Sequence, residues 1–140
     1  DPETQAILPR LADPLLPVLR AAATGRLTGF DAHLRTTDDE AVALTLAVAG
    51  YPTSPRIGDE ILGIAEARAA GVLVFGAGVT EQASEAGALV TSGGRVLTVV
   101  GRGSDLAEAA DRALSVADRI TFDGRQMRRD IGRATAGAVA

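Results

Sequence analysis

The hydrophobic spacing of this chain changes near residue 41, and this change limits the folds that the chain can adopt. Residues 41–49 alternate between apolar and small or polar side chains, which is the spacing of a β-strand with one buried face. The apolar residues of 106–120 recur instead at helical spacing. Strand and helix patterns are mixed without strict βαβ alternation. We therefore expect an α+β fold, with a small mixed or antiparallel sheet and flanking helices.

Two further apolar runs, 72–75 and 88–90, are short enough to be buried strands. Residues 91–94 read TSGG, a turn sequence that leads into a third apolar run over 95–100. The order strand, turn, strand predicts a hairpin of 88–90 with 95–100.

The helices are recognised by their caps. Asp1-Pro2 and Asp13-Pro14 each place an acidic N-cap before a proline at the first helical position, and Gly25 is a C-terminal cap. Residues 26–40 are polar and predict a linker or surface loop. The last helix opens with Asp105, which Glu108 answers at the spacing of a capping box.

Composition excludes several classes of function. The net charge of -4 argues against a nucleic-acid partner, and the absence of cysteine removes disulfides and thiolate chemistry. The longest apolar run, 41–50, is too short to cross a bilayer, so we expect a cytoplasmic protein without a membrane partner. All 14 basic residues are arginine, so neither a P-loop lysine nor a Schiff base can form. The chain opens without methionine, which predicts a segment removed upstream.

Several segments are candidate sites, and each has a structural explanation as well. The Gly50-Tyr51-Pro52 loop after the first strand is either a plain turn or a binding loop. Residues 75–78 resemble a phosphate loop, but they lack the third glycine of a dinucleotide motif, so a plain loop is favoured. Residues 91–95 could hold an anion with backbone amides and Arg95, or could simply form the hairpin turn.

The other charged residues are equally ambiguous. The arginines of 125–133 could bind phosphate or form a solvated helix end. His33 has no obvious partner in the polar stretch, and no metal site is expected from the spacing of its potential ligands. Asp1 and Glu3 could contribute to a magnesium site, although helix capping explains both acids as well.

Five ordered segments resemble the phosphoribosylamine–glycine ligases, also called glycinamide ribonucleotide synthetases. DPETQ at 1–5 resembles the end of that family's ATP-grasp domain, and AGYP…GDEILGI at 49–64 is similar to its Gly-Tyr-Pro loop region. AGVLVFGAG at 70–78, TSGGRVLTVVGRG at 91–103 and RRDIGRA at 128–134 resemble its later segments. Gly76 and Val79 stand where the family has His and Thr, and Pro55 stands where it often has tyrosine.

The resemblance implies a C-terminal fragment of an ATP-dependent ligase of purine synthesis. Such an enzyme joins glycine to 5-phosphoribosylamine with ATP and Mg²⁺, which Mn²⁺ could replace. Residues 1–25 would be the helical end of the ATP-grasp domain, 26–40 a linker and 41–140 the C-terminal domain. The expected partners are the absent ATP-grasp and N-terminal domains and the two small substrates.

The resemblance also implies roles for individual residues. The domain would help to close the active site, would bind neither ATP nor metal tightly and would not catalyse alone, and no catalytic residue is assigned. A non-catalytic stand-alone binding module derived from the same domain is the alternative. The residues expected to face substrate are Gly50, Tyr51, Pro52, Gly93, Gly94, Arg95, Arg129 and Asp130.

Overall fold

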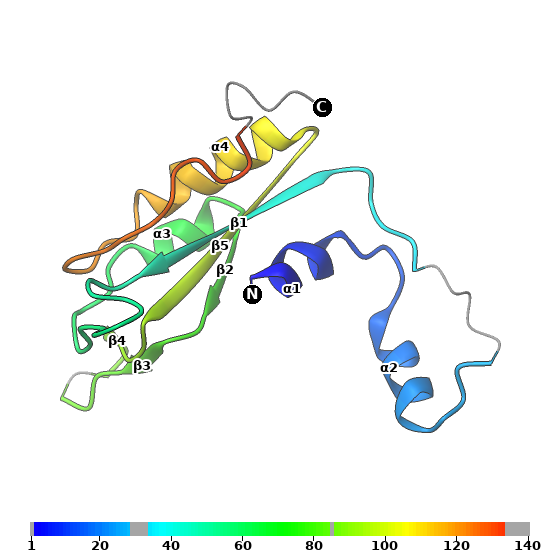
Figure 1. Cartoon of the computed structure of the whole chain (residues 1–140), viewed down its shortest axis with the longest axis horizontal. Helices are drawn as coiled ribbons and strands as arrows, with labels where there is room; N and C mark the ends of the chain where they lie inside the picture. Colours follow the sequence, from blue (N-terminus) through cyan, green and yellow to red (C-terminus); the bar gives the residue numbers. More distant parts are fainter. Residues whose placement is uncertain (1, 29–33, 85, 134–140) are drawn as a thin grey trace.

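The computed structural model of the protein describes residues 2–28, 34–84 and 86–133. Its centre is a three-stranded antiparallel sheet in the order β1-β5-β2, next to a two-stranded sheet of β3 and β4 (Figure 1). The elements in chain order are α1 (Glu3–Ile7), the 3-10 helix η1 (Leu8–Arg10), α2 (Leu15–Ala23), β1 (Glu40–Ala47), α3 (Ile64–Ala69), β2 (Leu73–Gly76), β3 (Val79–Glu81), β4 (Leu89–Thr91), β5 (Arg95–Gly103) and α4 (Leu106–Ala117). The expected α+β class with small antiparallel sheets and flanking helices is confirmed.

Strand β1 supplies the core residues that its alternation predicts. Val42, Leu44 and Leu46 of β1, and Val48 just after it, are all at most 3% exposed. Leu44 lies opposite Val99 of β5, and the register continues along the strand to an irregularity after Leu46. Aromatic side chains contribute little to this core, which is made mainly of alanine, valine, leucine and isoleucine.

Helix α4 covers one face of β1 and β5, and α1 lies against the same two strands on the side away from α4 (Figure 1). The α4 backbone approaches β5 closely because two glycines, Gly101 and Gly103, lie beneath it. A Cβ atom on Gly101 would be 2.2 Å from the carbonyl oxygen of Ala109 and 2.6 Å from the nitrogen of Ala113. Both alanines are fully buried, so the layer between helix and sheet has no room for larger side chains.

The predicted cap of the last helix is confirmed. The Glu108 amide donates to Asp105 Oδ1 at 2.8 Å, and the carboxylate of Glu108 accepts from the Ser104 amide at 2.7 Å. These bonds satisfy two donors at the helix start. The charge-assisted bonds from Ser104, followed by the charge of Arg112, hold the pKa of Glu108 below its usual value.

The predicted hairpin is wrong. Strand β4 pairs with β3, while β5 pairs with β1 and β2, so residues 91–94 connect two separate sheets. The prediction failed because β3 has three residues, too few to show alternation, and partner choice is decided by distant strands. Helix α3 was not predicted either, because its six residues are too few to show helical periodicity.

The predicted N-terminal helices are present. The N-cap of α2 is not Asp13, as expected from the sequence, but the residue after it. Pro14 occupies the N-cap of α2 and makes no side-chain cap bond. The Asp13 carboxylate instead accepts from the Arg35 amide at 2.7 Å and from Arg35 Nε at 2.9 Å, which lowers the pKa of Asp13. The expected Asp1 cap and His33 lie outside the described residues. Within the polar stretch, Thr36 bridges to Leu11, so this part is tied to the first helices.

No helix among the described residues is long and apolar enough to cross a membrane.

The α4–β5 contact predicts different effects for two Gly→Ala substitutions in the same sheet. Gly101→Ala places a methyl group within the backbone of α4, so we expect a loss of about 1–3 kcal/mol in the free energy of unfolding. Gly76→Ala is the matched control, because its Cβ would meet nothing closer than Val79 at 3.9 Å. Urea unfolding followed by circular dichroism measures both. Equal stability of the two variants would contradict the close approach.

Candidate functional site

Three glycine-bearing loops meet in a hollow of about 360 Å³ on the sheet face that is turned away from α4. The loops follow β1, precede β3 and precede β5, so residues distant in sequence lie together. The hollow is lined by Thr45, Tyr51, Ala77, Gly78, Gly93, Gly94, Arg95 and Thr98. The structure therefore brings together four of the residues that the sequence singled out: Tyr51, Gly93, Gly94 and Arg95.

The loops before β3 and β5 are in direct backbone contact. The Gly78 amide donates to the Arg95 carbonyl at 2.9 Å, and the Ser92 amide donates to the Gly78 carbonyl at 2.8 Å. A Cβ atom on Gly78 would lie 2.7 Å from both the Cα and the nitrogen of Gly93. Glycine is therefore required at residue 78 because two backbones approach each other, and the loop at 75–78 is more than a plain connection.

The Gly-Tyr-Pro loop reaches the hollow through Tyr51. Gly50 has φ +79° and its Cβ would lie 2.2 Å from the Ser54 carbonyl oxygen, so the turn needs glycine. The Tyr51 ring packs on Gly94, where an added Cβ would be 2.4 Å from the ring Cδ2. Gly50 and Pro52 belong to this loop without lining the hollow.

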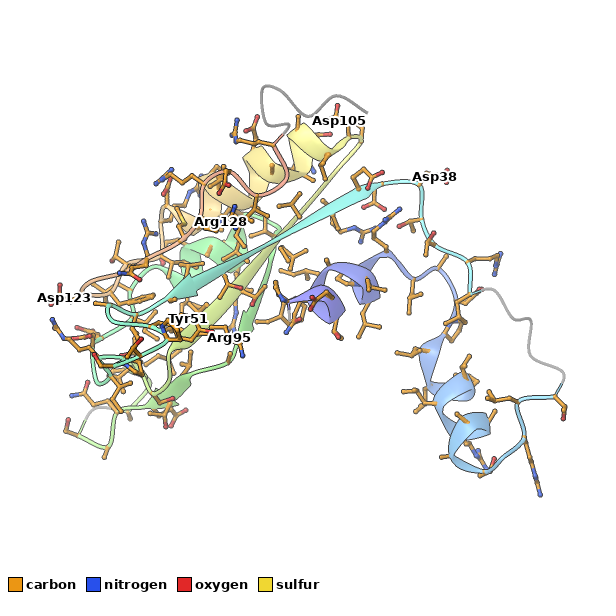
Figure 2. The ribbon with its side chains drawn as sticks, in the orientation of Figure 1. Asp38, Tyr51, Arg95, Asp105, Asp123 and Arg128 are labelled. Carbon is orange, nitrogen blue, oxygen red and sulfur yellow. The ribbon has the colours of Figure 1, made fainter. Side chains whose placement is uncertain are left out.

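Arg95 supplies the positive charge of the hollow. Its guanidinium carbon lies 6.0 Å from the centre of the Tyr51 ring, a cation–π distance, and the two side chains lie next to each other (Figure 2). Tyr51 is 40% exposed and Arg95 is exposed as well, so both groups are accessible from solvent. An anionic group of a small molecule is the ligand that this combination favours.

Two backbone amides of the TSGG sequence are engaged within the protein. The Thr91 amide donates to the Asp59 carbonyl at 2.9 Å, and the Ser92 amide is bonded to Gly78. The Thr91 hydroxyl accepts from the Asp59 amide at 3.0 Å. These bonds hold the loops together, so the amides of Thr91 and Ser92 are not available to an anion in the hollow.

Thr45 and Thr98 are site residues that sequence reasoning missed. They lie opposite each other on β1 and β5, on the face of the sheet that is turned away from α4. Thr98 is only 4% exposed although it is polar. The sequence did contain a hint of this role. On the face of β1 that is turned away from α4, every other residue is alanine, and Thr45 is the exception.

Arg56 and Asp59 follow the Gly-Tyr-Pro loop but do not line the hollow. The Arg56 guanidinium is 2.5 Å from carboxylate oxygens of both Asp59 and Asp123. Hydrogen bonding, first to Asp59 and then to Asp123, raises the pKa of Arg56. This network ties the loop to the segment that follows α4.

Arg129 and Asp130 are not brought to the hollow. Arg129 is paired with Asp118 at 2.5 Å, just beyond α4, and Asp130 is paired with Arg128 at 2.5 Å. Arg128 lies beside α4, well away from Tyr51 and Arg95 (Figure 2). The hydrogen bond from Arg128 lowers the pKa of Asp130. The role of Arg129 and Asp130 toward substrate stays a prediction.

Acidic side chains do not gather into a metal centre in the described part of the chain. No group of three or more His, Cys, Asp or Glu side chains that could hold a metal ion occurs among those residues. Asp59, which follows the Gly-Tyr-Pro loop, is paired with Arg56 instead.

Comparisons with known proteins agree on one family. Residues 41–134 match the family model described as "Phosphoribosylglycinamide synthetase, C domain". A protein named phosphoribosylamine–glycine ligase from Streptomyces coelicolor is 45% identical over 99% of this chain. One of the same name from Synechocystis is 48% identical over 94% of it. The resemblance seen in the five sequence segments is confirmed.

The solved structure of phosphoribosylamine–glycine ligase from Thermotoga maritima matches with a TM-score of 0.73 and 35% identity. The match covers 93% of this chain and 30% of that structure. The chain likewise spans about a third of the length of the curated relatives, 33% for the Streptomyces protein and 30% for the Synechocystis protein.

Tyr51 gives a direct test of the hollow, because it is the only tyrosine and the chain has no tryptophan. Gly94→Ala puts a methyl group where the ring packs, so we expect the ring to move out and its fluorescence to be quenched more strongly by acrylamide. Gly76→Ala is the control, since its added methyl would make only an ordinary van der Waals contact with Val79 at 3.9 Å. Unchanged quenching in Gly94→Ala, with the fold retained by circular dichroism, would contradict the packing of the ring on Gly94.

Proposed function

Because this chain belongs to the phosphoribosylglycinamide synthetase C-domain family, we propose that it works as part of an enzyme that joins glycine to 5-phosphoribosylamine. The products would be glycinamide ribonucleotide, ADP and phosphate, in purine synthesis. The names of the relatives support this proposal, and the chain corresponds to about a third of each of them.

Within that enzyme, the domain closes the active site over the phosphoribosyl substrate. The observation that carries this role is the hollow in which Arg95 and Tyr51 converge from two loops. A guanidinium can donate two parallel hydrogen bonds to a phosphate, which fixes the orientation of the ligand as well as its position. The tyrosine ring limits where the guanidinium can move.

The chemistry with ATP belongs to the part of the enzyme that precedes this domain. The chain has no lysine for the phosphates, and its described residues form no metal cluster. In this proposal the domain contributes substrate binding and closure, and it does not turn over alone.

A non-catalytic binding module is the second candidate. It is favoured by Gly76 and Val79, which stand where the resembled family has His and Thr. Gly76 ends β2 and Val79 begins β3, on either side of the Ala77-Gly78 turn that lines the hollow. Loss of two polar groups from this loop would weaken catalysis while leaving Arg95 able to bind an anion.

The N-terminal elements provide the contact with the preceding domain. Helix α2 extends away from the sheet, and its Leu16 and Leu19 are 76% and 53% exposed (Figure 1). Ile7 of α1 is 57% exposed. Apolar side chains in water are unfavourable, so a partner surface that covers them is stabilising. This exposure supports a division into residues 1–25 on the ATP-grasp side, 26–40 as the connection and 41–140 as the C-terminal domain.

Arg95→Gln in the full-length enzyme tests the substrate-binding role. Loss of a charge-assisted bond to the substrate phosphate should reduce kcat/KM for phosphoribosylamine by about tenfold or more, with the KM for ATP unchanged. Arg68→Gln is the matched control, since Arg68 is exposed on α3 and does not line the hollow. Equal activity of the two variants would refute the role of Arg95. If the enzyme without any substitution is inactive but still binds ribose 5-phosphate, the result would favour the second candidate, a non-catalytic binding module.

Leu16→Ser tests the docking surface. Because Leu16 is 76% exposed in this chain, the substitution should change the stability of the isolated chain by no more than about 0.5 kcal/mol. In the full-length enzyme the same change should destabilise the protein and speed hydrogen exchange in α2. Equal effects in the two contexts would mean that nothing covers α2.

A further inference from the structure

A second cleft lies at the far end of β5 from the hollow. It has a volume of about 240 Å³ and is bordered by the end of α3, the start of β2 and the second half of α4. Its lining contains three arginines and no carboxylate, although the chain as a whole carries a net charge of -4. The arginines are Arg102, Arg112 and Arg119.

Two of the arginines are held in place by carboxylates outside the cleft. Arg102 is hydrogen-bonded through Nε and a terminal nitrogen to Asp39. Hydrogen bonds from Arg102, followed by one from the Thr37 hydroxyl, hold the pKa of Asp39 far below its usual value, so this carboxylate stays ionised. Arg112 is 2.5 Å from Glu108 and also donates to the Arg102 carbonyl at 3.1 Å. These bonds leave other N–H donors of both guanidinium groups unused, because each group has five.

Arg119 differs from the other two. Its guanidinium makes no hydrogen bond or ion pair with any residue that the structure describes, and it lies two residues beyond the end of α4. It is therefore a cation whose donors are available to a ligand. Ser115 cannot replace it as a donor, because its hydroxyl donates to the Arg112 carbonyl at 2.9 Å.

The base of the cleft is apolar. Val100 and Val116 line it and are 1% and 2% exposed. Charge interactions beside such an apolar surface are screened less than in open water.

This cleft is separate from the hollow. Arg95 and Arg102 are seven residues apart on β5, which corresponds to about 23 Å along an extended strand. The two sites share no lining residue.

We propose that the three-arginine cleft binds the phosphate group of a small phosphorylated metabolite, at a site distinct from the one that faces substrate. Arg119 makes the contacts that decide affinity, and Arg102 and Arg112 add pre-oriented donors. The enclosed volume favours a small molecule over an extended polymer. The proposal does not rest on the proposed catalytic function.

A titration of the ¹⁵N-labelled chain with inorganic phosphate, and then with ribose 5-phosphate, tests the proposal. We expect saturable shifts of the amides of residues 70–73 and 115–119, and none from ribose. Arg119→Gln should weaken this binding by about tenfold or more, because a charge-assisted contact is lost. Arg26→Gln, which removes the same charge from an exposed position elsewhere, should leave the affinity unchanged.

Arg95→Gln separates the two sites. It should abolish any shifts around residues 93–95 and leave those of 70–73 intact, so failure at one site is distinguishable from failure at the other. The proposal is overturned if residues 70–73 show no saturable shift, or if Arg119→Gln binds phosphate as tightly as the parent chain. In both variants, amide signals far from the substituted residue should overlay those of the unsubstituted chain, which establishes that the fold is retained.

Discussion

The close contact between α4 and β5 is the constraint on which the rest of the structure depends. Gly101 and Gly103 have no side chains, and the helix presents small residues such as Ala109 and Ala113 to them. The helix backbone can therefore lie directly on the central strand. Because β5 is hydrogen-bonded on one side to β1 and on the other to β2, fixing β5 fixes the whole sheet. The loops at its start, which form the hollow, take their positions from this contact.

Local signals in the sequence predicted the elements that are long or capped. The alternation of 41–49 predicted β1, and Asp105 with Glu108 marked the start of α4. The pairing of strands was not predictable in the same way. The turn at 91–94 has the composition of a hairpin, yet its flanking strands pair elsewhere: β4 pairs with β3, and β5 pairs with β1 and β2.

The candidate site was predictable in part for the same reason. Tyr51 lies in a glycine-containing loop, and Arg95 directly follows another. Such loops are visible in the sequence, but only the fold brings the two side chains together. Thr45 and Thr98 were missed because their role comes only from facing each other across two strands. Arg129 illustrates the reverse case, since its cluster of charges has the composition of an anion site, while in the structure Arg129 ties the final segment to Asp118.

The central strand has one more consequence. Strand β5 is paired with β1 along its length and with β2 over Leu97–Val100, so it cannot slide without breaking the hydrogen bonds to both neighbours, and the sheet fixes the spacing between Arg95 and Arg102. Communication between the two ends would therefore appear as a tilt of the whole domain against its neighbours, rather than as a rearrangement inside it.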